Sequence, residues 1–100
     1  MIELIEKAKD KVVVKLRANN LNRINANQFK EELTAILDEY DNFIIDLSNI
    51  RTIDCFAFGK ILLFNEELES KSGKLKIINV ESEYLRTVFS LLKNDLKLCL

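Results

Sequence analysis

Residues 43–63 of this chain read FIIDLSNIRTIDCFAFGKILL. The stretch opens with an apolar run, Phe43 to Leu47, continues with a short polar link, and then shows apolar residues at helical spacing. This order predicts a buried strand whose carboxyl end leads into the start of a helix. The first backbone N–H groups of a helix lack intrahelical partners, so such a junction can bind an anion or present a residue for modification. Here the helix start carries Cys55.

The composition indicates one small domain. One hundred residues can bury a single core, and 48% apolar with 31% charged residues is ordinary for a globular protein. The net charge of −1 comes from interspersed charges of both signs, which argues against a nucleic-acid partner. The apolar runs are far shorter than the ~20 residues that span a bilayer, and Met1-Ile2-Glu3 does not begin a signal peptide. We therefore expect a single cytoplasmic domain over residues 1–100, without membrane insertion.

Three residue types restrict the chemistry. The chain has no histidine, which removes Ser-His-Asp and Cys-His nucleophiles and the commonest metal ligand. With two glycines it cannot form a Gly-rich phosphate loop. The cysteines, Cys55 and Cys99, form no C-x-x-C pair, and in a reducing cytosol they are expected to be free thiols. We expect no enzyme activity, no cofactor and no metal site; an enzyme that uses Cys55 stays open as a minor alternative.

Apolar periodicity predicts the element order β-β-α-β-α-β-α-β. The expected strands are residues 2–6, 11–16, 43–47, 75–80 and 96–100, and the expected helices are 26–40, 56–71 and 83–92. Helices between the later strands require parallel pairing with right-handed crossovers, whereas the first two strands are expected to pair antiparallel. The predicted fold class is therefore α/β, a mixed and mostly parallel sheet with helices packed on it.

Local signals predict how these elements begin and end. Asn25 is expected to cap the first helix, with Gln28 three positions on as in a capping box. Gly73 is expected to end the second helix, and the asparagine-rich residues 17–25 predict a loop. The strand 43–47 is apolar on both sides, which is typical of the middle of a sheet flanked by helices. The core-facing stripe of the second helix is predicted to consist of Ala57, Ile61, Phe64 and Leu68.

The junction in this arrangement resembles the signature of STAS domains, D-L-S/x-x-V-x-x-I/M-D-S-S-G-L-G. Residues 46–59, DLSNIRTIDCFAFG, match it without a gap. Residues 21–26, LNRINA, are similar to the family's L-D-x-x-T/N-A at the first helix, and residues 73–75, GKL, fit the G-G-x-L before the fourth strand. The resemblance covers nearly the whole chain and implies the STAS fold, which agrees with the predicted element order.

The resemblance implies a non-enzymatic protein switch of the kind best known in bacterial anti-sigma-factor antagonists. Such an antagonist binds a partner, commonly an ATP-binding anti-sigma factor that is also a serine kinase. Phosphorylation of the serine directly after the motif aspartate breaks the complex, and a phosphatase restores it. The physical reason is that a phosphate adds about −1.5 to −2 charges at the contact surface. The family therefore implies signal transduction and transcription regulation through protein–protein contacts.

This chain departs from the signature at the phosphoacceptor position. Cys55 stands where the family has the serine, Phe56 replaces a second serine, and Ala57 replaces a glycine. Asn22 stands where the family usually has an aspartate. Cysteine is not a substrate of serine/threonine kinases, so we expect phosphorylation control at this position to be absent. The resemblance then implies a STAS-like binding module that lacks the usual switch.

Two residues of the helix start have a functional and a plain interpretation. Cys55 could be a redox-sensing thiol near a helix N-terminus, or a small residue that fills a tight turn. Phe56 lies off the core stripe beside Leu63 on a helical wheel, so the pair could form part of an interface. The plain alternative is that Phe56 tucks back beneath residues 49–53. Both alternatives remain open from the sequence.

The neighbouring carboxylates and asparagines are best explained structurally. Asp54 is expected to cap the second helix, and Asp46 is expected to accept hydrogen bonds from amides of the link. The loop 19–25 should lie at the same end of the sheet as Cys55 if the strands are parallel. In the family this end contacts the partner, although turn formation alone also explains the asparagines.

Two functions are predicted for this surface. The first is an anti-sigma-factor antagonist-like regulator that binds its partner constitutively. The alternative is a cytoplasmic STAS accessory subunit of an ABC-type phospholipid transporter, whose partner is the transporter ATPase. The sequence predicts neither the partner's identity nor the oligomeric state. The predicted contact surface comprises the loop 19–25, which includes Asn22, and the residues Asp54, Cys55, Phe56, Lys60 and Leu63.

Overall fold

A computed structural model describes residues 1–92 of the chain. The elements are β1 (Ile2–Lys7), β2 (Lys11–Leu16), β3 (Asn20–Leu21), α1 (Ala26–Ala35), the 3₁₀ turn η1 (Leu37–Glu39), β4 (Asn42–Asp46), β5 (Thr52–Ile53), α2 (Cys55–Ser70), β6 (Lys74–Ile78) and α3 (Glu83–Leu92). Within this range the longer strands and the helices occupy the predicted segments. The strand predicted at 96–100, with Cys99, lies outside the described residues.

The main sheet has the strand order β1-β2-β4-β6. β1 pairs antiparallel with β2, while β2, β4 and β6 are parallel neighbours. The register places Val12, Phe43 and Leu75 in one row across the three parallel strands. The predicted mixed and mostly parallel α/β sheet is therefore confirmed.

A second, two-stranded sheet was not predicted. β3 and β5 pair in parallel, with Asn20 opposite Thr52 and Leu21 opposite Ile53. The prediction of a loop throughout residues 17–25 is therefore wrong at 20–21. Two-residue strands carry no periodic signal, and this pair forms only because distant segments meet.

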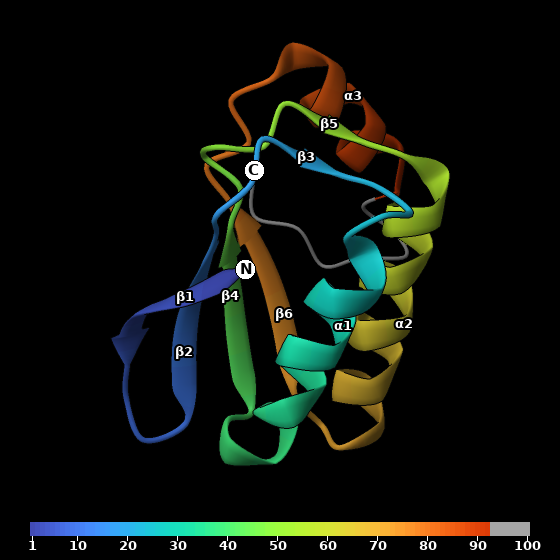
Figure 1. Cartoon of the computed structure of the whole chain (residues 1–100). Helices are drawn as coiled ribbons and strands as arrows, with labels where there is room; N and C mark the ends of the chain where they lie inside the picture. The colour runs from blue at the N-terminus through green and yellow to red at the C-terminus, as the bar shows by residue number, and fades with distance from the viewer. Residues whose placement is uncertain (93–100) are drawn as a thin grey trace.

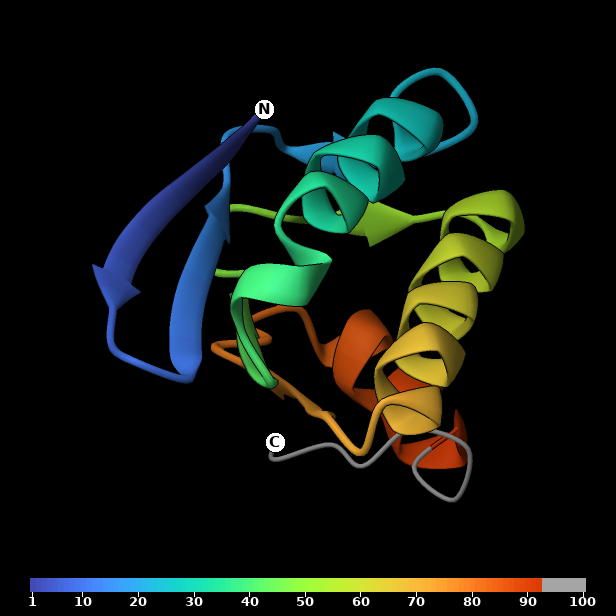
Figure 2. The same ribbon diagram turned by 90° about the horizontal axis from the view of Figure 1, so that it is seen from below.

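The core lies between the main sheet and the helices α1 and α2, which run side by side over one face (Figures 1 and 2). The inward-facing strand side chains Val14, Phe43, Ile45 and Ile77 are fully buried. The predicted stripe of α2 meets them and is buried in full. In α1 the buried residues are Ala26, Phe29 and Leu33, and the α-helix ends earlier than predicted because η1 tightens its last turn. Burial of these apolar side chains between the sheet and the two helices contributes most to the stability of the fold.

The sheet is not flanked by described helices on both faces. In neither view does a helix of residues 1–92 lie over the face opposite α1 and α2 (Figures 1 and 2). Ile44 on that face is only half-buried, between Val13 and Lys76 on the adjacent strands. A lysine stem can shield apolar neighbours while its ammonium stays in water. The two-sided apolar character of β4 therefore does not require a second helical layer.

Gly73 follows α2 as predicted, but not for the expected reason. The left-handed backbone position is taken by Ser72, with φ of 64°, and Gly73 itself has no positive φ. A Cβ atom on Gly73 would lie 2.6 Å from the carbonyl oxygen of Asp41. Glycine is needed here because two backbones approach closely, and not because of its own dihedral angles.

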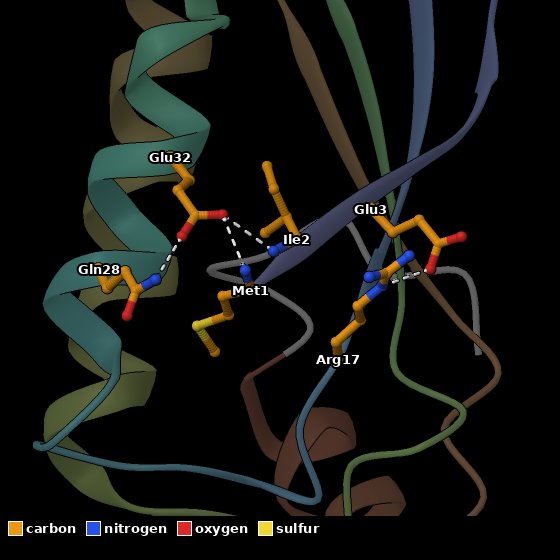
Figure 3. Close-up of polar contacts among 6 residues, drawn as sticks. All are labelled: Met1, Ile2, Glu3, Arg17, Gln28 and Glu32. Atoms are coloured by element: carbon orange, nitrogen blue, oxygen red, sulfur yellow. Dashed lines mark hydrogen bonds and ion pairs between the residues drawn. The ribbon is translucent and has the colours of Figure 1, made fainter.

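The amino-terminal strand is tied to α1 by a carboxylate. Glu32 accepts a hydrogen bond from the Ile2 backbone N–H at 2.9 Å and lies 3.4 Å from the Met1 amino group (Figure 3). Gln28 donates to the other Glu32 oxygen, and so does not form the predicted capping box. Burial acts to raise the pKa of Glu32, but the hydrogen bonds from Ile2 and Gln28 and the Met1 amino group outweigh it, so this pKa is lowered.

Candidate partner-binding surface

The link after β4 is held by Asp46, as predicted. One Asp46 oxygen accepts from the Ser48 backbone N–H at 2.8 Å, and the other accepts from the Asn79 side chain at 3.1 Å. Burial acts to raise the pKa of Asp46, but the hydrogen bonds from Ser48 and Asn79 prevail, and the pKa is lowered. Asp46 is therefore a structural carboxylate that fixes the path of the chain towards α2.

Asp54 caps α2, which confirms the prediction. Its Oδ1 accepts from the Ala57 backbone N–H at 2.8 Å. Its Oδ2 accepts from the Arg23 backbone N–H at 3.1 Å, a contact that the sequence did not predict. One carboxylate thus stabilises the helix start and fastens the 19–25 loop beside it.

The loop 19–25 lies at the same end of the sheet as the start of α2. Besides the β3–β5 pairing, the Thr52 hydroxyl donates to Asn20 Oδ1 at 2.6 Å, and the Arg51 N–H donates to the Asn19 carbonyl at 2.6 Å. Figure 1 shows the loop before α1 next to the first turn of α2. The predicted juxtaposition is therefore confirmed, and its cause is a set of hydrogen bonds between segments about thirty residues apart in the chain.

Asn25 stands at the N-cap position of α1 but does not cap the helix with its side chain. Its Oδ1 accepts from the Asn22 N–H at 2.9 Å, and its Nδ2 donates to the Asn20 carbonyl at 2.8 Å. The Asn22 side chain in turn accepts from the Ile24 N–H at 2.9 Å. Asparagine side chains can bond either the first N–H groups of a helix or backbone groups of a nearby turn, and here they bond the turn.

The first turns of α2 carry the other predicted contact residues on the surface. Cys55 is exposed, Phe56 is 41% exposed and Leu63 is 48% exposed. Phe56 therefore does not tuck beneath residues 49–53. Lys60 lies one turn beyond Phe56, with its Nζ 5.2 Å from the ring centroid, at cation–π distance. A polar cap and Phe56 thus lie at the start of α2, and Leu63 is exposed two turns further along the helix.

The loop 19–25, predicted as part of the contact surface, presents one large apolar side chain that the sequence did not single out. Ile24, in the loop before α1, is 89% exposed. Its only signal was an apolar residue inside a polar loop, which by itself has no periodicity and no assigned role. The residue before it, Arg23, bonds Asp54 through its backbone N–H, so the loop that carries Ile24 is fastened to the start of α2.

Within residues 1–92, cysteine, aspartate and glutamate side chains form no group of three or more that could hold a metal ion. Of the helices described here, none is long and apolar enough to cross a membrane.

Comparisons with known proteins agree on one family. The family model for the STAS domain matches residues 3–97. The Bacillus cell fate determinant SpoIIAA, in its phosphorylated form, matches with a TM-score of 0.74 at 19% identity, covering 100% of this chain and 92% of that one. An anti-sigma factor antagonist from Mycobacterium paratuberculosis gives 0.74 at 15% identity, over 98% of this chain and 83% of that one.

A transporter contains the same fold. The murine anion transporter Slc26a9 matches with a TM-score of 0.71 at 12% identity, over 85% of this chain but 14% of that chain. At these identities the structural likenesses show the fold alone, and a search of curated protein sequences gave no significant match. The family model covers nearly the entire chain, and the chain therefore belongs to the STAS domain family.

Proposed function

We propose that this protein is a non-enzymatic protein-binding module, an anti-sigma-factor antagonist-like signalling regulator without the usual serine phospho-switch. The observation that carries the proposal is the exposure of Phe56, on the first turn of α2, and of Leu63, two turns further along the same helix. Neighbouring large apolar side chains on a wet helix face favour a binding surface more than isolated ones do. Membership of the STAS family and the fold shared with antagonists support the same function.

Within the proposed contact surface the residues have different roles. Phe56 and Leu63 are about two helical turns apart and can enter a partner together, with Lys60 between them. Asp54 already accepts two backbone hydrogen bonds, so it shapes the surface more than it contacts the partner. Asn22 likewise uses its side-chain oxygen within the loop. We assign the binding energy to the apolar residues and the geometry to the polar ones.

The missing switch follows from Cys55. This residue directly follows the cap Asp54 and is exposed on the first turn of α2, the place that matches the phosphoacceptor in the family signature. A thiol is not a serine kinase substrate, so no phosphate charge can be added there to break the complex. Binding would then be controlled by the amounts of the two proteins.

Affinity capture from the producing cells tests the surface. Wild-type protein is expected to recover a kinase-like anti-sigma factor, and Phe56→Asp is expected to lose it. Tyr84→Asp is the matched control, because Tyr84 is an exposed aromatic residue on α3 and lies outside the proposed surface. Equal recovery by Phe56→Asp and wild type would reject this surface.

The missing switch has a separate test. Wild-type protein and Cys55→Ser are incubated with ATP and the recovered kinase-like partner, and intact masses are measured. We expect a phosphate on Cys55→Ser and none on wild type. Phosphate transfer to the wild-type chain would contradict the loss of the switch while leaving the binding surface in place.

The second candidate function is an accessory subunit of an ABC-type phospholipid transporter. The fold shared with part of an anion transporter chain favours it. Recovery of a transporter ATPase in the same capture experiment, again lost with Phe56→Asp, would replace the antagonist function with this one.

A further inference from the structure

Ile24 is the most exposed large apolar side chain in residues 1–92, with 89% of its surface accessible. A single exposed isoleucine needs no explanation, but this one lies at the same end of the molecule as the exposed Phe56. The Arg23 N–H bonds Asp54, the residue immediately before α2, and Phe56 is on the first turn of that helix. Both views show the loop before α1 next to the start of α2 (Figures 1 and 2).

The loop that presents Ile24 is already ordered by side-chain acceptors. The backbone N–H groups of residues 22, 23 and 24 bond Asn25 Oδ1, Asp54 Oδ2 and Asn22 Oδ1 at 2.9, 3.1 and 2.9 Å. A partner that buries Ile24 therefore has little backbone ordering to impose, and pre-organisation of this kind strengthens binding.

The two segments that form this surface, residues 17–25 and 51–63, are basic, although the whole chain carries −1 and Glu81 lies at the same end beside Asn19 and Arg51. No acidic residue occurs between Lys11 and Lys30, and Asp54 is the only one between Leu47 and Asn65. Arg23 is exposed and Lys60 is half-buried at the same end. α1 and α2 both begin here (Figure 1), and the first N–H groups of each helix add partial positive charge.

We infer, on the basis of the proposed function, that Ile24 is a second apolar anchor of the contact surface, and that the surface accepts an apolar pocket rimmed by acidic residues on a protein partner. Ile24 and Phe56 supply two separated apolar contacts, one from a fixed loop and one from a helix. Arg23 and Lys60 border them and complement carboxylates on the partner. Charge complementarity of this kind raises association rates and fixes orientation.

Site-specific crosslinking in the producing cells tests the anchor. Variants carry the photo-crosslinking residue p-benzoylphenylalanine at position 24, 56 or 5, and the captured peptides are identified by mass spectrometry. Position 5 is the matched control, because Ile5 is also an exposed isoleucine, 48% accessible, but lies on β1. We expect positions 24 and 56 to capture the same protein, at apolar segments flanked by aspartate or glutamate, and position 5 to capture neither segment.

The outcomes separate this inference from the proposed function. Capture from position 56 without capture from 24 would overturn the anchor while the proposed surface stands. Capture from neither, with capture from position 5, would overturn both. A second copy of this chain captured at position 24 would also overturn the inference, and so would a partner segment without acidic residues.

Binding measurements with the purified captured protein give the size of the effect. Ile24→Ser is expected to weaken binding at least about tenfold, as an anchor does, with an unchanged melting temperature. Ile5→Ser is expected to keep the affinity within about twofold of wild type, as for residues outside the contact, and to leave the melting temperature unchanged. Arg23→Gln is expected to slow association and flatten its salt dependence. An unchanged affinity of Ile24→Ser would reject the anchor, and an unchanged salt dependence would reject the acidic rim.

Discussion

The two ends of the parallel sheet are held together in different ways. At the amino end, seen at the bottom of Figure 1, backbone groups bond each other: Asp41 N–H and Asn42 N–H donate to the Asp10 carbonyl, and Lys74 N–H donates to the Asp41 carbonyl. The Lys71 side chain adds bonds to the Leu37 and Tyr40 carbonyls there. At the carboxyl end, side chains such as Asp46 and Asp54 hold the connections. The amino end depends on close backbone contact. At the carboxyl end, polar side chains fix the backbone that carries the exposed apolar residues. Stability and binding should therefore be separable at the carboxyl end.

The largest expected effect compares two phenylalanines on the first turn of α2. Phe58 is 9% exposed and packs edge-on against Phe89, with ring centroids 5.1 Å apart, whereas Phe56 is 41% exposed. Phe58→Ala should lower the free energy of unfolding by about 3–4 kcal/mol, because it leaves a cavity between α2 and α3. Phe56→Ala should lower it by no more than about 0.5 kcal/mol and weaken partner binding. Urea unfolding measures the loss of unfolding free energy in each variant. Equal losses in the two variants would show that binding and stability are not separable here.

The next comparison uses the only two glycines in the chain. Gly73→Ala would place a Cβ atom 2.6 Å from the Asp41 carbonyl oxygen, so the amino-end backbones must part, at a cost of about 2–3 kcal/mol. Gly59 lies within α2, and a Cβ atom there would meet nothing within 4 Å. Gly59→Ala should therefore raise the free energy of unfolding by about 0.5–1 kcal/mol. Changes of the same sign in the two variants would contradict the close contact at the amino end.

Asp54 is the position where a substitution is expected to lower both the stability of the fold and the affinity for the partner. Asp54→Ala leaves the Ala57 and Arg23 N–H groups without their acceptor and should cost about 1–2 kcal/mol. It should also weaken binding, because the loop with Ile24 loses its attachment to α2. Asp54→Asn keeps one acceptor oxygen and should recover most of the stability. Hydrogen exchange of the Arg23 amide checks the attachment, and unchanged protection in Asp54→Ala would contradict it.

The parts of the fold that were predicted are those with local signals. The apolar run at 43–47 and the stripe Ala57, Ile61, Phe64 and Leu68 identify a buried strand and an amphipathic helix from spacing alone. Asp54 was predicted as a cap because capping involves neighbours in the sequence. The same reasoning failed at Asn25, whose side chain bonds Asn22 and Asn20 in the loop instead.

The parts that were missed depend on contacts between distant residues. The β3–β5 pair forms where residues 20–21 meet residues 52–53, and neither segment is long enough to show a period. The bond from Arg23 to Asp54 spans 31 positions. The loop 19–25 was predicted to lie in the contact surface, but the bond that fastens it to the start of α2 was not predicted. The proposed contact residues on α2 and the place of the loop beside them were therefore predictable, whereas the hydrogen bonds that fix the loop and the exposure of Ile24 were not.

The smallest effect concerns Glu32, which holds the start of β1 at the carboxyl end (Figure 3). Its pKa is lowered from 4.5, so its folded form releases its proton at a lower pH than the unfolded chain does. The contribution of Glu32 is therefore fully present above its unfolded pKa and is lost as the pH falls through its folded pKa. Glu32→Gln should cost about 0.5–1 kcal/mol at pH 7, and the difference from wild type should shrink below pH ~4.5. Glu31→Gln, on the exposed side of α1, is the control and should show no such dependence. A difference that stays constant down to pH ~3 would mean that Glu32 acts through packing and not through its charge.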